Sequence, residues 1–261
     1  MKIQLGSELT KITSTRLWWL LLLVMVGLTT GFGTFLVYAA LHAPASPLRL
    51  DSADKIVLLY NLPVAIAYVF PLAFGVILVT QEYNSRTIVH TLLGEPRKHL
   101  VYGAKLLIGL GVAFVYGVVS VGLSAAVTAV MLSAQGTDPH LADSQVISAL
   151  LGSLAVLTLW GPIGVAIGAL VRNQVVAIVG ILLVTRFIEP MVRMGAARFG
   201  YAELGSYLPG GAGDTASGGT VIDAAAGTNP ASPLLGFLVL GAYSVILAAL
   251  GQIRFTRYEA S

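Results

Sequence analysis

Residues 17–41 read LWWLLLLVMVGLTTGFGTFLVYAAL and contain no charged side chain. A helix of about 20 apolar residues is long enough to cross the hydrocarbon core of a bilayer, so this run predicts a membrane-spanning helix. Lys2, Lys11 and Arg16 precede the run, as basic residues do in a signal peptide. The apolar part of a signal peptide, however, is only about 7–15 residues long. We therefore interpret residues 17–41 as a retained signal-anchor helix.

Five further apolar stretches follow the first one. The six predicted spans cover residues 17–41, 56–80, 106–133, 146–170, 175–194 and 233–253. Backbone groups in hydrocarbon must hydrogen-bond within their own segment, which favours helices. The stretches are also too long and too uniform for the alternating strands of a membrane barrel. The sequence predicts an all-α membrane protein in which residues 1–261 form a single transmembrane domain.

The overall composition agrees with lipid as the main solvent of the chain. Hydrophobic residues make up 56% of the chain and charged residues 10%, whereas soluble domains carry roughly 25% charged residues. The absence of cysteine excludes disulfides, zinc–cysteine sites and iron–sulfur clusters. The four histidines are scattered over loops and make no metal-binding pattern, so we predict no metal site.

The distribution of basic residues predicts the orientation of the chain in the membrane. With the N-terminus inside, ten of the 15 Lys and Arg residues fall on cytoplasmic segments and five on outer ones. Cytoplasmic loops carry such an excess of Lys and Arg. We therefore expect a multi-pass protein of the bacterial cytoplasmic membrane with both termini in the cytoplasm.

Two segments outside the spans have a recognisable character. Residues 1–16 form a predicted amphipathic helix on the cytoplasmic surface, with Ile3, Leu9, Ile12 and Arg16 near one another and Glu8 and Lys11 elsewhere on the surface. Residues 195–232 are rich in small residues, and we expect a flexible outer segment with turns at Pro209-Gly210-Gly211 and Asn229-Pro230.

The sequence lacks the motifs of the membrane enzymes that we considered. It contains neither H-E-x-x-H nor G-x-S-x-G, and the GxGD tetrapeptide at Gly211–Asp214 has no second aspartate in an apolar helix to complete an aspartyl protease site. There is also no P-loop, so the chain by itself does not bind ATP. The first four spans have no ionisable residue in their middles, which argues against a proton- or sodium-coupled carrier. We therefore expect that the chain is not an enzyme.

The segment from Gln81 to Lys105 is the only long charged connection on the predicted cytoplasmic side. Glu82 closes the second span, and residues 84–95 form a short predicted helix that Pro96 ends. The apolar residues of that helix share one face: Ile88, Leu92 and Leu93. Such a helix, held between two spans, suits docking into the groove of a partner protein. The alternative is a solvated connector with no partner.

This pattern resembles the permease subunits of ABC-2-type transporters, which are exporters with six spans per subunit. The residues that fit the family's signature are Glu82, Thr87, Leu92, Leu93, Pro96, Arg97 and Lys105. Two departures are that Arg86 stands where glycine is usual and that Arg97 directly follows the proline. The segments Ser7–Ile12 and Tyr207–Pro209 also resemble the family's N-terminal helix and its outer segment.

The resemblance implies a working unit of two permease copies, as a homodimer or a related heterodimer, with two copies of a separate ATP-binding-cassette subunit. ATP and magnesium bind the ATPase, and this chain holds no cofactor, contacts membrane lipid and binds no nucleic acid. The short cytoplasmic helix becomes a coupling helix whose contacts with the ATPase are Glu82, Arg86, Thr87, Leu92, Leu93, Pro96 and Arg97. The resemblance also implies a re-entrant outer segment between the fifth and sixth spans.

The sequence leaves the cargo and part of the function open. A hydrophobic or amphipathic cargo suits the apolar spans. One alternative is a cytochrome-biogenesis-type ABC permease, which has the same number of spans. Another alternative is a membrane scaffold or assembly protein that transports nothing. Co-purification with an ATPase distinguishes a transporter from a scaffold.

Some residues inside the spans have two readings. Arg186 and Glu189 lie three apart in the fifth span, where they can pair on one helix face before Pro190 breaks the helix. One interpretation is that the two residues form an outer gate. The other is that the Arg186 side chain extends towards the outer headgroups. The prolines Pro63, Pro71 and Pro162 either kink spans that shape a translocation pathway or reflect the general frequency of proline in membrane helices.

Overall fold

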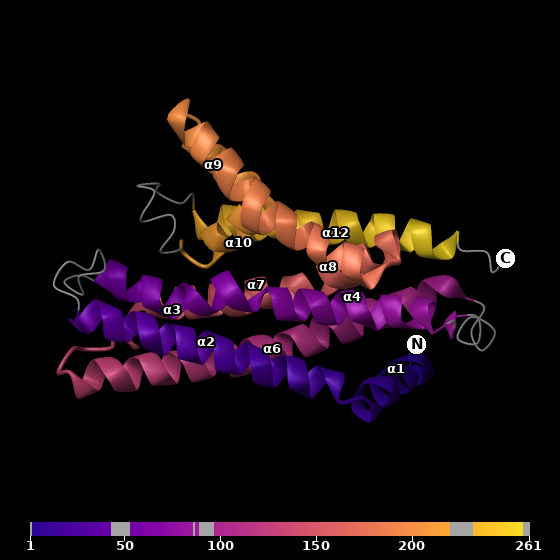
Figure 1. The fold of residues 1–261 in the computed structure, drawn as a ribbon, viewed down its shortest axis with the longest axis horizontal. Helices are drawn as coiled ribbons and strands as arrows, with labels where there is room; N and C mark the ends of the chain where they lie inside the picture. Colours follow the sequence, from indigo (N-terminus) through magenta and orange to yellow (C-terminus); the bar gives the residue numbers. More distant parts are fainter. Residues whose placement is uncertain (1, 43–52, 86, 89–96, 220–231, 258–261) are drawn as a thin grey trace.

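The computed structural model describes residues 2–42, 53–85, 87–88, 97–219 and 232–257 of the chain. Every regular element in this part of the chain is a helix, and six helical segments are long and apolar enough to cross a membrane. Most of these segments run along the long axis of one bundle (Figure 1). The predicted all-α, multi-pass membrane fold is confirmed at this level.

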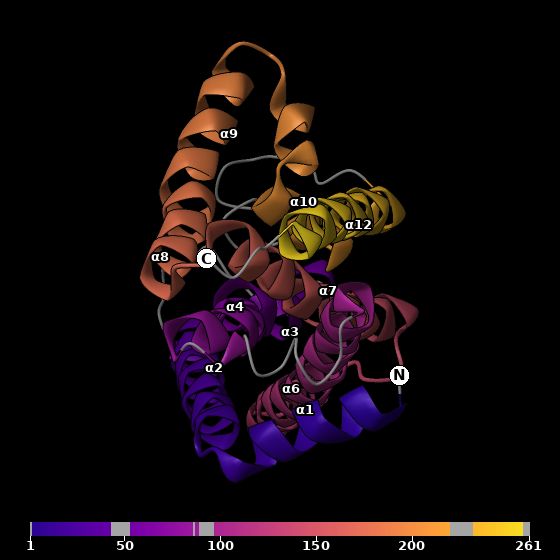
Figure 2. The same ribbon diagram turned by 90° about the vertical axis from the view of Figure 1, so that its right-hand side faces the viewer.

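The N-terminal helix lies across one end of the bundle. This helix, α1 (Lys2–Ser14), is separated by a bend at residues 15–16 from α2 (Leu17–His42), the first span. Figures 1 and 2 show α1 at a steep angle to the spans. Its main contacts are with α6 (Lys98–Ala134), the third span. We call this end of the bundle the α1 end and the opposite one the far end.

The centre of the bundle is α7 (Ser144–Val171), the fourth span. It packs against α6, against α4 (Val69–Asn84) and against α12 (Pro233–Thr256), the last span. Figure 2 shows α7 between these helices when the bundle is viewed from the α1 end. The faces of α2 and α12 that point away from α7 leave many large apolar side chains uncovered, as expected of helices that face lipid.

Glycine allows α7 and its neighbours to approach very closely. A Cβ atom added at Gly168 would lie 2.9 Å from the carbonyl oxygen of Val76, and one added at Gly109 would lie 2.7 Å from Val165 Cγ2. Small residues at helix contacts bring backbones together in this way in membrane bundles. Gly109 and Gly168 therefore serve helix packing within the chain.

The helices of the second and third spans extend beyond the predicted spans. The second consists of α3 (Ala53–Ala67) and α4, which continues to Asn84, and α6 already begins at Lys98. The prediction ended these spans where the apolar residues end. Glu82 and Lys105 nevertheless lie inside helices, because each finds a partner of opposite charge.

The prolines affect their helices differently. A single turn residue, Tyr68, separates α3 from α4 three positions before Pro71, whose ring nitrogen cannot donate to the carbonyl of Ala67. By contrast, α7 continues through Pro162 without interruption. Pro63 belongs to α3, and its side chain lies outside the described part of the structure. The role of these prolines in a pathway stays a prediction.

The fifth span bends away from the bundle without ending at its proline. It consists of α8 (Gln174–Leu183), a π-helical turn η1 (Val184–Ile188) and α9 (Glu189–Arg198). The prediction that Pro190 breaks the helix is wrong. The wider π turn just before it accommodates a residue that donates no backbone hydrogen bond, and α9 continues beyond it. Figure 1 shows α9 diverging from the other spans at the far end.

The described part of the segment between the fifth and sixth spans, residues 199–219, is largely helical, including Pro209-Gly210-Gly211, where the sequence predicted a turn. The turn predicted at Asn229-Pro230 lies outside the described residues. A 3₁₀ helix η2 (Ala202–Tyr207) leads into α10 (Pro209–Ala216), in which Pro209 is the first residue. Gly211 and Gly213 are buried in α10. A Cβ atom on Gly213 would lie 3.3 Å from Val156 Cγ1 in the middle of α7, so these glycines let α10 pack closely against the bundle.

Candidate functional site

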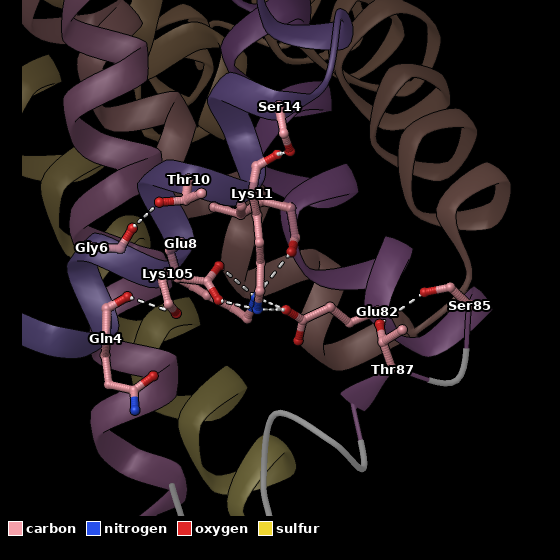
Figure 3. Close-up of polar contacts among 12 residues, drawn as sticks. Gln4, Gly6, Glu8, Thr10, Lys11, Ser14, Glu82, Ser85, Thr87 and Lys105 are labelled. Carbon is pink, nitrogen blue, oxygen red and sulfur yellow. Dashed lines mark hydrogen bonds and ion pairs between the residues drawn. The ribbon is translucent and has the colours of Figure 1, made fainter. Parts of the chain in front are cut away.

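Four charged side chains from three helices meet at the α1 end (Figure 3). The Lys11 ammonium donates to Glu8 Oε1 and to Glu82 Oε1, at 2.7 Å each. The Lys105 ammonium donates to Glu8 Oε2 and lies equally close to Glu82 Oε1, at 2.9 Å in both cases. We call these four residues the charge network, because each carboxylate contacts both ammonium groups.

Helix geometry brings the four residues together. Glu8 and Lys11 are three apart on α1 and so share one face of it. Glu82 lies in the last turn of α4, and Lys105 lies in α6 about two turns after its start. Lys105 also donates to the carbonyl oxygen of Leu78 in α4, at 3.3 Å. The network therefore joins the transverse helix α1 to two membrane spans.

Three of the four side chains are almost completely buried. Lys105 is 0% exposed, Glu8 1% and Glu82 8%, whereas the side chain of Lys11 is 44% exposed. Removing a charge from water is costly unless the charge is paired and hydrogen-bonded. Here two negative and two positive groups are paired with one another, so their charges cancel.

The network also shifts the ionisation of the two residues on α1. Burial by itself would raise the pKa of Glu8, but Lys105 and Lys11 together outweigh burial, so the pKa of Glu8 is lowered. Burial would likewise lower the pKa of Lys11, but the carboxylates of Glu8 and Glu82 outweigh it and raise the pKa of Lys11. Both groups are therefore charged over a wide range around neutral pH.

The structure corrects the predicted surface of α1. The sequence placed Glu8 on the surface and Leu9 with the apolar face, but Glu8 is buried together with Ile12, and Leu9 is half exposed. The prediction gave apolar residues priority on the packed face. It missed that Lys105 in α6 supplies a buried partner for Glu8, and no periodicity within α1 contains that information.

A pocket of about 680 Å³ opens beside the charge network, between α1 and α4. Its lining includes Glu8, Lys11 and Glu82 of the network. The rest of the lining is partly apolar and partly made of hydroxyl and amide side chains, among them Phe74, Ile77, Leu78, Ser7, Ser14 and Gln81. The volume falls within the range of small-molecule sites.

Only part of the predicted coupling segment belongs to the described structure. Glu82 joins the charge network. Thr87 is exposed, and its hydroxyl shares a 2.9 Å hydrogen bond with the Ser85 hydroxyl. Arg97 is exposed and directly precedes α6. The remaining residues of the prediction lie outside the described residues: Arg86, Leu92, Leu93 and Pro96. The short helix predicted over residues 84–95 therefore stays a prediction.

The C-terminal end of the last span also lies at the α1 end (Figure 1). Lys98 at the start of α6 donates to the carbonyl oxygen of Thr256 at 3.2 Å, and Arg172 after α7 donates to that of Arg254 at 2.9 Å. Both ends of the described chain are therefore on one side of the bundle, which agrees with an even number of crossings.

A second group of polar residues holds α10 at the far end. The Glu189 carboxylate is buried and accepts hydrogen bonds from the backbone N–H groups of Gly210, at 2.8 and 3.1 Å, and of Gly211, at 3.1 Å. Arg193, one turn further along α9, donates to Asp214 Oδ2 with two nitrogen atoms at 3.0 Å. Glu189 thus caps the N-terminus of α10 while Arg193 binds its C-terminal half.

The predicted pair of Arg186 and Glu189 does not form. The Arg186 guanidinium lies over the ring of Tyr68, 4.8 Å from its centroid, while Glu189 faces α10. The π turn changes the angular offset between the two positions, so their spacing of three does not place them together as in a regular helix. The ion pair there is made by Arg193, which had no predicted role, and Asp214, which the sequence suggested only as part of the GxGD tetrapeptide.

The described residues contain no group of three or more histidine, aspartate or glutamate side chains that could hold a metal ion. The charge network joins α1, α4 and α6 through contacts between opposite charges. No protein-family model matches the chain, and no curated protein is similar enough in sequence to count as a relative.

Proposed function

We propose that this protein is the permease subunit of an ABC exporter of the ABC-2 type, and that a separate ATPase drives it. The observation that carries the proposal is the charge network. Its members Glu82 and Lys105 belong to one segment that resembles the family's signature, and Glu8 and Lys11 belong to the other, the N-terminal helix. Residues from two separate segments that each resemble the family are thus in direct contact.

The network gives this proposal a physical basis for energy coupling. An external motor that pushes on the connection between α4 and α6 acts on the two helices that hold Glu82 and Lys105. Glu8 and Lys11 tie α1 to the same two helices. A displacement at this end is therefore shared by α1, α4 and α6 as one unit, as expected of an element that switches between two states.

The chain requires an outside source of energy under this proposal. Its sequence has no P-loop, and the network's charges are closely paired with one another, which does not suit a proton relay. The excess of Lys and Arg on the segments at the α1 end favours a cytoplasmic location for that end. An ATPase in the cytoplasm would meet the α4–α6 connection there.

Co-expression with the ATPase encoded nearest to this chain tests the proposal. We expect a stable complex of two permeases and two ATPases, with an ATP hydrolysis rate that responds to the permease. Arg97→Glu should weaken that response while leaving folding intact, because Arg97 is exposed and lies outside the charge network. Arg198→Glu, an exposed arginine at the far end, is the matched control.

Two results would contradict the proposal. One is a purified protein that binds no nucleotide-hydrolysing partner, which would favour a scaffold. The other is an Arg97→Glu variant that keeps wild-type stimulation of the ATPase, which would remove the predicted coupling segment from the interface.

A further inference from the structure

The lining of the pocket between α1 and α4 combines apolar and polar side chains. The apolar ones are Ile12, Leu17, Phe74, Ile77 and Leu78. Hydroxyl and amide side chains, together with Glu8, Lys11 and Glu82 of the charge network, make up the rest. A molecule that fills such a pocket needs an apolar part and a hydrogen-bonding part. The pocket lies between α1 and α4. An amphipathic helix that lies across the ends of membrane spans, as α1 does in Figure 1, is typically found at the level where lipid headgroups meet acyl chains.

One carboxylate oxygen of Glu82, a residue that lines this pocket, is buried and has no hydrogen-bond donor among the described residues. Both ammonium groups approach Oε1 of Glu82, and Glu82 Oε2 is buried without a partner. Figure 3 shows this second oxygen directed away from the lysines. Buried carboxylate oxygens are normally hydrogen-bonded, so the site suits a ligand that brings a donor of its own.

The charges of the network select the kind of headgroup. The two carboxylates and two ammonium groups sum to zero, so neither a simple anion nor a simple cation is strongly attracted. A zwitterion can use both signs at once. Lys11, whose side chain is 44% exposed, can face the anionic part, and Glu82 can accept from the cationic part.

We propose that this pocket binds the headgroup of a zwitterionic phospholipid with a primary ammonium, namely phosphatidylethanolamine. The ammonium donates to Glu82 Oε2, the phosphate accepts from Lys11, and the start of the acyl chains lies along Phe74 and Ile77. Phosphatidylcholine has no N–H group to donate to Glu82, and phosphatidylglycerol has no ammonium. This site is independent of the proposed export function, since it needs only the membrane setting.

Binding of single lipids to the detergent-purified protein tests the proposal, with native mass spectrometry as the readout. The probes are phosphatidylethanolamine, phosphatidylcholine and phosphatidylglycerol with identical acyl chains. We expect phosphatidylethanolamine to bind about tenfold more tightly than either of the others, because a charge-assisted hydrogen bond is at stake. Equal binding of the three lipids would overturn the proposal. Glycerophosphoethanolamine, which has no acyl chains, should bind far more weakly, and equal binding would exclude a lipid site.

Two variants locate the binding and separate it from folding. Glu82→Gln should reduce phosphatidylethanolamine binding to the level of phosphatidylcholine, while Glu203→Gln, an exposed carboxylate at the far end, should change nothing. Ser14→Trp places a large side chain in the pocket from an exposed position and leaves the four charges in place. This variant tests whether the lipid binds in the pocket even if Glu82→Gln does not fold. A Ser14→Trp variant that still prefers phosphatidylethanolamine tenfold would show that the lipid binds elsewhere.

Discussion

The Lys105 ammonium of α6 lies 2.9 Å from the Glu8 carboxylate of α1, although 97 positions separate the two residues in the chain. Both side chains are almost completely buried. Moving α1 away would break the contacts of Glu8 with Lys105 and of Lys11 with Glu82, and would leave Lys105 with Glu82 alone. Breaking a buried ion pair costs more than losing an exposed one. This contact therefore fixes where the N-terminal helix docks on the membrane spans.

Lys105→Met is expected to destabilise the protein by about 3–5 kcal/mol, because it leaves two buried carboxylates with Lys11 alone. Thermal unfolding of the purified protein in detergent measures the loss as a lower Tm. Arg198→Met, at an exposed position of the far end, is the control and should leave the Tm unchanged. If both variants unfolded at the wild-type temperature, the network would contribute nothing to the docking of α1.

The double variant Glu8→Gln with Lys105→Met should lose less stability than the two single losses added together, because the second change removes a partner that is already missing. A double-mutant cycle on unfolding temperatures or denaturant midpoints gives the coupling between them. Strict additivity would mean that the two residues do not interact in the folded protein.

Stability should fall in acid in a way that depends on Glu8. The folded pKa of Glu8 is lowered, so the unfolded chain binds more protons between the two pKa values and stability rises with pH there. Its contribution is complete above the ordinary pKa of 4.5 and disappears as the pH falls through the folded pKa. Unfolding temperatures measured from pH 3 to pH 7 should show a shallower acid loss in Glu8→Gln. An identical slope in both proteins would contradict this assignment.

Glu189→Ala should loosen α10 while leaving the rest of the bundle intact. The change removes the acceptor for the backbone N–H groups of Gly210 and Gly211, a capping loss of about 1–2 kcal/mol. Hydrogen–deuterium exchange of residues 209–216 should speed up, while exchange in α7 stays the same. Glu189→Gln retains a side-chain acceptor and should show a smaller effect. Unchanged exchange in the alanine variant would mean that Glu189 does not hold α10.

The effects of Gly→Ala substitutions on stability should distinguish packed helix faces from uncovered ones. Gly168→Ala places a Cβ 2.9 Å from the Val76 carbonyl oxygen, and overpacking of this kind costs about 1–3 kcal/mol. Gly27→Ala and Gly31→Ala meet nothing within 4 Å and should be neutral in the isolated chain. Comparison of the three unfolding temperatures checks the expectation, and a neutral Gly168→Ala would show that α4 and α7 can move apart freely.

The apolar pattern by itself determined the membrane class, the number of spans and, within a few residues, where most spans lie. Runs such as residues 17–41 permit no other structure, because hydrocarbon offers their backbone no hydrogen-bond partners. The same pattern did not predict how far the helices of the second and third spans continue beyond their apolar residues. Glu82 and Lys105 lie in these extensions, where they contact each other.

Only the tertiary structure decided how the polar residues inside and beside the spans are used. The pairing of Glu8 with Lys105, of Glu189 with the start of α10, and of Arg193 with Asp214 joins positions that are distant in the chain. A residue's periodicity shows which face of its own helix it occupies, but not which helix lies opposite. In a bundle held together at glycine contacts, the choice of neighbour depends on the whole packing, and so does the partner of each buried charge.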